Sequence, residues 1–181
     1  MALFGLLGRG RHERTGFELY GHAVRAARDP YYYEVLGVPD TLDGRFDLVG
    51  LHVCLVIRRL RNLPPPGPVI AQAVFDAMFL DMDTNLRELG VGDQTIARNV
   101  RAMWEAFHGR ATAYEAPLAE ADPVALAAAI QRNVWREAEA PGAAGLARAA
   151  LGQMAALDAT PPADVMAGRV VFAAPASLVQ A

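Results

Sequence analysis

Residues 46–57, FDLVGLHVCLVI, form the longest apolar stretch of this 181-residue chain. Phe46, Val49 and Val53 recur at the spacing of one helix face, and the three leucines of the stretch occupy a second face. A helix that is apolar on two faces packs against neighbours on both. The stretch therefore predicts a central helix, running from about Asp43 to Arg61, in an all-α fold.

The same stretch argues against a membrane span. Asp47 and His52 interrupt it, and it falls short of the about 20 apolar residues that cross a bilayer. The N-terminal residues, MALFGLL, are apolar first and are followed by arginines, the reverse of the order in a secretory signal. We therefore expect a protein that is soluble or peripheral to a membrane.

Start and stop signals predict a helix before the central one. Thr15 followed by Glu18 forms a capping box, which predicts a helix from Thr15 to about Arg28. Pro30 ends this helix. We expect Tyr31–Tyr33 to form a connector, and two roles for these tyrosines stay open: a recognition surface, or a pin that holds the connector on the core.

Further helices follow the proline-rich segment 64–68, which cannot continue a helix. The first ends at Gly90, in the position of a C′ glycine. The second begins with Asp93 as its cap and ends at Gly109. The third begins at the pair Asp122–Pro123. A weak apolar stripe in an alanine-rich region after Pro141 predicts one more.

The whole pattern predicts one all-α domain. Residues 15–158 are expected to form a compact bundle of about six to eight helices. Residues 1–14 are expected to be a flexible N-terminal segment, and residues 159–181 an extended C-terminal tail that is docked or mobile. No alternation of polar and apolar residues is long enough to predict a sheet.

The composition excludes several classes of protein. A net charge of −3 lacks the basic excess of nucleic-acid-binding proteins, so we expect no nucleic-acid partner. Cys54 is the one cysteine, which excludes an internal disulfide and a cysteine-rich zinc site. All 17 basic residues are arginine, which indicates a GC-rich and, in our interpretation, bacterial genome.

An acidic segment is the first candidate for an active site. An EF-hand loop starting at Asp81 fails, because Leu86 and Gly92 occupy the positions that need Gly and Glu. A magnesium-dependent enzyme of the isoprenoid type, using Asp81 and Asp83, remains an alternative. That enzyme would need acidic motifs on two facing helices, and the sequence has one.

Other catalytic arrangements are missing from the sequence. His52 and Cys54 point about 200° apart on a helix, so they cannot share a metal ion. We expect Cys54 in the core and His52 as a hydrogen-bonded histidine of the core or its boundary. No serine or cysteine has a base and an orienting group nearby in sequence, and no phosphate-binding loop occurs. We predict no catalytic residue, no metal ligand and no cofactor.

Several short motifs occur in a fixed order: GVPDTLDGRFD at 37–47, RRL at 58–60, FDAMF at 75–79, DMD at 81–83, GVGD at 90–93 and AFHGR at 106–110. In these motifs the chain resembles the ubiquinol–cytochrome c chaperone family, over about residues 17–135. His108 departs from the tyrosine of the family pattern.

The resemblance implies a non-catalytic, all-α assembly factor. Its partners would be newly made cytochrome b and possible further assembly factors. It would work at the cytoplasmic face of the bacterial inner membrane. A generic protein-interaction module is the remaining alternative. A separate hypothesis gives the N-terminus a membrane contact through four apolar and three basic residues: Leu3, Phe4, Leu6, Leu7, Arg9, Arg11 and Arg14.

Partner-binding residues are expected in two places. Part of the 37–47 motif builds a turn and a helix cap, and Arg45 and Asp47 are expected to stay exposed beside Phe46. An acidic stripe is expected to meet basic cytoplasmic loops of the partner. The stripe consists of five acidic residues and one arginine: Asp76, Asp81, Asp83, Glu88, Asp93 and Arg87. The residues predicted to bind a partner are Asp40, Asp43, Arg45, Phe46, Asp47, Asp76, Asp81, Asp83, Arg87, Glu88 and Asp93.

Overall fold

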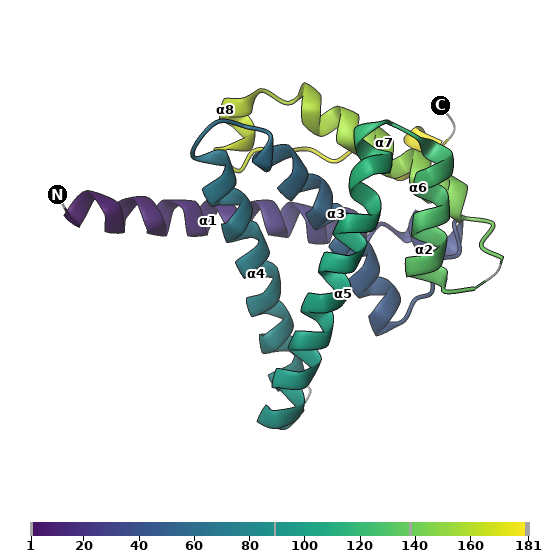
Figure 1. Ribbon diagram of the computed structural model, residues 1–181, viewed down its shortest axis with the longest axis horizontal. Helices are drawn as coiled ribbons and strands as arrows, with labels where there is room; N and C mark the ends of the chain where they lie inside the picture. The colour runs from purple at the N-terminus through teal and green to yellow at the C-terminus, as the bar shows by residue number, and fades with distance from the viewer. Residues whose placement is uncertain (1, 89, 138, 180–181) are drawn as a thin grey trace.

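The computed structural model describes residues 2–88, 90–137 and 139–179, with side chains from Gly10 onward. These residues form nine α-helices, one π-helical turn and no strand, so the predicted all-α fold is confirmed (Figure 1). In chain order the elements are α1 Ala2–Ala27, α2 Pro30–Glu34, α3 Leu42–Arg61, α4 Gly67–Glu88, α5 Asp93–Ala119, α6 Pro123–Ile130, η1 Gln131–Trp135, α7 Ala143–Ala159, α8 Pro162–Val165 and α9 Pro175–Val179.

Helix α3 is the centre of the fold, as predicted. Every residue from Phe46 to Val56 is buried, and the helix contacts α1, α4, α5 and α7. The hydroxyl oxygen of Thr41 caps its first turn by accepting a hydrogen bond from Gly44 N. At its other end, Arg59 donates to the carbonyl oxygens of Leu157 and Thr160, which ties α3 to the end of α7.

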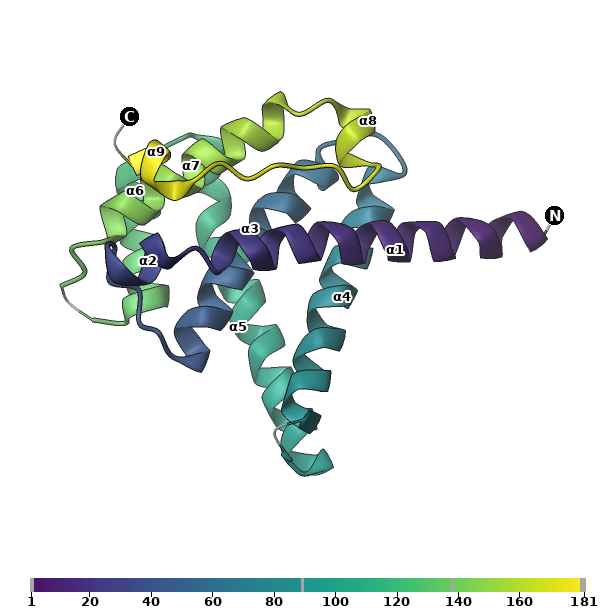
Figure 2. The ribbon, with the colours of Figure 1, turned by 180° about the vertical axis from the view of Figure 1, so that it is seen from behind.

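The remaining helices surround α3 on several sides. Helix α1 crosses α3 and α4, and its N-terminal half projects beyond the body (Figures 1 and 2). Helices α4 and α5 form an antiparallel hairpin that extends away from the body, while α6 and α7 pack at the opposite end. No helix of the described residues is long and apolar enough to cross a membrane.

The predicted start of the first helix at Thr15 is wrong. Helix α1 begins at Ala2 and runs without a break through the expected N-terminal segment. Thr15 is a buried residue inside the helix, and its hydroxyl donates to Arg11 O at 3.1 Å. The proposed membrane contact by residues 3–7 involves side chains outside the described set.

The tyrosine segment is a short helix and not a connector. Asp29 caps α2 by accepting from Tyr31 N at 3.0 Å, and Pro30 occupies the first helical position. Tyr32 is buried, and Tyr33 donates its hydroxyl proton to Ala27 O at 2.9 Å. These contacts pin α2 to the core, which decides between the two roles left open by the sequence for Tyr32. For Tyr33, which is half-buried, both roles stay open.

Helix α5 begins and ends differently from the prediction. Gly92 is the N-cap, and Asp93 is the first residue of the helix. The helix does not end at Gly109, because its buried face continues through Arg110 and Tyr114 to Leu118. The predicted end of α4 is confirmed: Gly90 has a φ of +75°, and Val91 N donates back to Leu86 O at 3.2 Å.

The C-terminal tail is short and docked on the body. It contains α8 and α9, and residues 169–174, between a turn at 166–168 and α9, belong to no helix or strand. The side-chain amide of Gln153, on α7, holds this stretch by two hydrogen bonds to the backbone of Ala173. Its Nε2 donates to Ala173 O, and its Oε1 accepts from Ala173 N. The ring of Phe172 packs edge-on against His52, with centroids 5.4 Å apart.

His52 is the hydrogen-bonded core histidine that the sequence predicts. Its Nδ1 lies 2.8 Å from Leu48 O and therefore carries the proton, because a carbonyl only accepts. Its Nε2 then accepts from the Tyr32 hydroxyl at 3.2 Å. Complete burial lowers the pKa of His52 to about 4.

This buried histidine predicts a loss of stability in acid. Between pH 6.5 and about 4 the unfolded chain binds a proton at His52 and the folded chain does not, so falling pH favours unfolding. Relative to His52→Gln, the wild-type protein should lose about 3 kcal/mol of unfolding free energy across this window. Urea titrations at several pH values measure the difference. A difference between the two proteins that stays constant with pH contradicts the assignment.

Candidate functional site

A large groove lies where α1 and α2 end, α3 begins and the α4–α5 hairpin leaves the body. Its volume is about 1060 Å³. Apolar and aromatic side chains line it: Tyr20, Val24, Tyr33, Leu42, Phe46, Val49, Met82, Leu86 and Met103, with Pro30 beside them. Charged and amide side chains also line it: Arg28, Glu34, Asp40, Arg45, Asp81, Asn85 and Glu88. We call this site the groove.

A tight turn places the 37–47 motif on one wall of the groove. A Cβ at Gly44 would lie 2.0 Å from Pro39 O, so only glycine allows this approach. The turn brings Asp40 and Arg45 together in an exposed ion pair of 2.6 Å, and the Arg45 guanidinium lowers the pKa of the Asp40 carboxyl. Leu42, the first residue of α3, remains 75% exposed at the groove.

The opposite wall is one flank of α4. Asp81, Asn85 and Glu88 line the groove at successive turns. The Tyr20 hydroxyl donates to Asp81 Oδ2 at 2.6 Å. Burial, together with this carboxylate, raises the pKa of Tyr20 well above its ordinary value.

The other acidic residues of α4 lie on a different flank. Asp76 accepts from the Gln72 amide, and Asp83 pairs with Arg87 at 2.7 Å. Arg87 also pairs with Asp93, at 2.8 Å, near the tip of the hairpin. The predicted acidic stripe is therefore divided, and only its Asp81 and Glu88 line the groove. Asp43 is exposed in the first turn of α3, outside the groove lining.

The expectation that Asp47 stays exposed is wrong. Its side chain is fully buried, with Oδ1 2.6 Å from Arg110 Nη2 and Oδ2 2.9 Å from Arg136 Nη2. Burial raises the pKa of Asp47 to about 6, against the opposing effect of the two guanidinium groups. Asp47 therefore joins α3 to α5 and to the end of η1, and it offers no surface to a partner.

Phe46 connects this buried ion pair to the groove. Its ring lies in the groove lining, and the Arg110 guanidinium carbon sits 5.5 Å from the ring centroid. A cation over an aromatic face is attracted by the ring quadrupole. Arg110 thus contacts two adjacent residues of the 37–47 motif: it pairs with the carboxylate of Asp47 and lies over the ring of Phe46.

The candidate residues for metal chemistry have other partners. Among the described residues, no three His, Cys, Asp or Glu side chains are grouped closely enough to hold a metal ion. Asp81 accepts from Tyr20 and Asp83 from Arg87, so the two carboxylates of the alternative enzyme hypothesis have separate contacts. Burial raises the pKa of the Cys54 thiol to about 12, as expected for an unreactive core cysteine.

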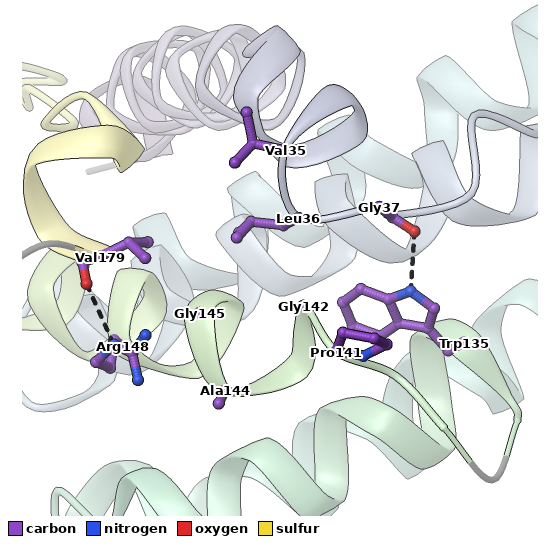
Figure 3. Close-up of a pocket in the computed structure, with 10 residues that line it drawn as sticks. All are labelled: Val35, Leu36, Gly37, Trp135, Pro141, Gly142, Ala144, Gly145, Arg148 and Val179. Carbon is purple, nitrogen blue, oxygen red and sulfur yellow. Dashed lines mark hydrogen bonds between the residues drawn. The ribbon is translucent and has the colours of Figure 1, made fainter.

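A second cavity, of about 330 Å³, lies between residues 35–37 of the α2–α3 link and the start of α7 (Figure 3). The Trp135 indole closes one end and donates to Gly37 O at 2.9 Å. At the other end Arg148 donates to Val179 O at 3.3 Å. Sequence reasoning missed this cavity, because its walls come from segments that are far apart in the chain.

Both walls of the groove lie within a segment that matches a known family, and the lining residues of α1, with Pro30 and Tyr33 of α2, precede that segment. The family model described as Ubiquinol-cytochrome C chaperone matches residues 34–172, a span that includes both walls of the groove. The chain belongs to the ubiquinol–cytochrome c chaperone family. The resemblance seen in the sequence is thereby confirmed.

Two proteins are similar to this chaperone-family chain, one in structure and one in sequence. The crystal structure of the Cbp3 homolog from Brucella abortus is similar to it, with a TM-score of 0.84 and 31% identity over 98% of this chain and 99% of that one. Ubiquinol-cytochrome-c reductase complex assembly factor 1 from Xenopus laevis is 26% identical over 103 residues. That match covers 57% of this chain and 51% of the frog protein, so the chain spans about half of that relative's length.

Proposed function

We propose that this chaperone-family member binds newly made cytochrome b through the groove and assists assembly of the ubiquinol–cytochrome c reductase complex, without catalysis. The observation that carries the proposal is the meeting of the 37–47 motif and the acidic flank of α4 in one groove. These segments are more than thirty residues apart in the sequence. An apolar lining with charged edges suits a client that is itself partly apolar.

The charges of the groove support a membrane-protein client. Four carboxylates face two guanidinium groups: Glu34, Asp40, Asp81 and Glu88 against Arg28 and Arg45. Membrane proteins carry an excess of Lys and Arg in their cytoplasmic loops. An acidic groove therefore attracts that side of a client, which supports a working position at the cytoplasmic face of the inner membrane.

Co-purification from a membrane extract tests the proposal. The wild-type chain should capture cytochrome b, and Asp81→Asn combined with Glu88→Gln should weaken capture about fivefold at low salt, since each of the two exposed pairs is worth about 0.5 kcal/mol. The amide oxygen introduced by Asp81→Asn can still accept the hydrogen bond from Tyr20, so the fold is kept. High salt should reduce the difference.

The outer flank of α4 provides the matched control. Asp76→Asn combined with Asp83→Asn removes the same charge from the same helix, outside the groove lining. This variant should capture cytochrome b like the wild type. Equal loss in both double variants would assign the effect to net charge, and reproducible absence of cytochrome b from the wild-type eluate would refute the function.

A further inference from the structure

Three helices turn apolar side chains toward the groove at helical spacing. On α3 these are Leu42, Phe46 and Val49, at positions i, i+4 and i+7. On α4 they are Met82 and Leu86, four residues apart, and α1 contributes Val24. In a helical bundle such faces pack against another helix. Leu42, at 75% exposure, is the least covered of them.

Resting on the proposed function, we propose that the part of the client that enters the groove is an amphipathic α-helix with basic residues along one flank. The walls of the groove are helices, and the described residues contain no sheet edge that could pair with an extended chain. The apolar part of the lining cannot satisfy free backbone N–H and C=O groups. The client segment that enters the groove, here called the guest, must therefore form its backbone hydrogen bonds internally, as an α-helix does.

The lining also suits a guest of variable sequence. Met82 of α4 and Met103 of α5 both line the groove. Methionine has an unbranched, polarisable side chain that adapts to differently shaped apolar partners. Grooves that accept amphipathic helices use methionine in this way. The volume, about 1060 Å³, lies at the upper limit of small-molecule pockets and favours a polypeptide segment.

The charges set the orientation of the guest. Asp81 and Glu88 are seven residues apart on α4, which places them about 10 Å apart along one side of the groove. On the opposite wall the carboxylate of Asp40 is already paired with Arg45. Basic residues two turns apart on the guest helix would meet the α4 side, with the apolar face between the two walls.

The test uses the full chain and fluorescent model peptides. The first probe is a Leu/Lys peptide of about 18 residues, five helical turns, with its lysines on one flank. The second has the same composition in a scrambled order without an apolar face. The third is amphipathic with glutamate in place of lysine. Fluorescence anisotropy should give at least tenfold tighter binding for the first probe than for either other.

Two variants locate the binding. Leu42→Asn changes an exposed residue and should weaken binding of the first probe about tenfold, the effect of losing one buried leucine contact. Leu80→Asn is the matched control, because Leu80 is 56% exposed on α4 outside the groove lining, and it should leave binding unchanged. Circular dichroism of both variants verifies that the fold is retained.

The outcomes separate this inference from the proposed function. If the chain captures cytochrome b and binds the first and scrambled probes equally, the helix inference is overturned and the function stands. If it binds the first probe selectively and never captures cytochrome b, the groove assignment stands and the function fails. A wild-type dimer that Leu42→Asn dissociates would overturn the inference in favour of a second copy of this chain as the occupant.

Discussion

Replacing Asp47 with alanine should lower the free energy of unfolding by about 3 to 5 kcal/mol, because it leaves a buried cation without its partner. The Arg110 side chain is 11% exposed, and its Nε and Nη1 have no hydrogen-bond partner within the protein. The carboxylate of Asp47 is the charge that compensates it. Urea denaturation at pH 7.5 measures the change, and Tm should fall by about 10 °C.

Two further variants decide whether the unpaired charge is the cause. Asp47→Ala combined with Arg110→Met removes both charges and should recover most of the lost stability. Arg136→Gln should cost no more than about 1 kcal/mol, since the Arg136 side chain is 46% exposed and water screens its pair with Asp47. Equal losses in the single and the double variant would instead point to lost packing around α3.

The result would also divide the 37–47 motif by function. Asp47, which is buried, and Thr41, which caps α3 from an exposed position, would both serve folding. Asp40 and Leu42 would belong to the surface of the groove. A motif can identify a family while half of its residues act on folding, so the loss of binding in an Asp47 variant says nothing about contact with a client.

Local signals in the sequence predicted the elements that depend on neighbouring residues. The cap and proline at Asp122–Pro123 start α6 as predicted, with Asp122 Oδ1 accepting from Val124 N and Ala125 N. The glycine at Gly90 ends α4 as predicted. The pattern of Thr15 and Glu18 misled, because a threonine followed three residues later by a glutamate also occurs inside helices, where the hydroxyl bonds to the preceding turn.

Long-range contacts could not be predicted in this way. Asp47 lies 63 residues from Arg110 and 89 from Arg136, and no helical or capping pattern links positions that far apart. In the structure Asp81 and Glu88 line the groove, whereas Asp76 and Asp83 lie outside its lining. Which flank borders the groove depends on how α4 crosses α1 and α3, and that crossing is a property of packing.

Replacing Gly44 with alanine should destabilise the protein, although helix propensity alone predicts the opposite. Alanine inside a helix is favoured over glycine by about 1 kcal/mol. Here the added Cβ would lie 2.0 Å from Pro39 O and 3.0 Å from Pro39 C, which are backbone atoms of the turn and cannot rotate away. Relieving this overlap moves the turn or the first turn of α3, at a cost of about 3 kcal/mol. The net loss should be about 2 kcal/mol in urea denaturation.

Gly109→Ala is the control that isolates the clash from the propensity. Gly109 also lies inside a helix, α5, and a Cβ added there meets no atom within 4 Å. This variant should gain about 1 kcal/mol of stability. If the two alanine substitutions change the free energy of unfolding in opposite directions, the close contact with Pro39 requires glycine at position 44. A stabilising effect at both would mean that the turn shifts freely, and the placement of Asp40 and Leu42 at the groove would then not depend on Gly44.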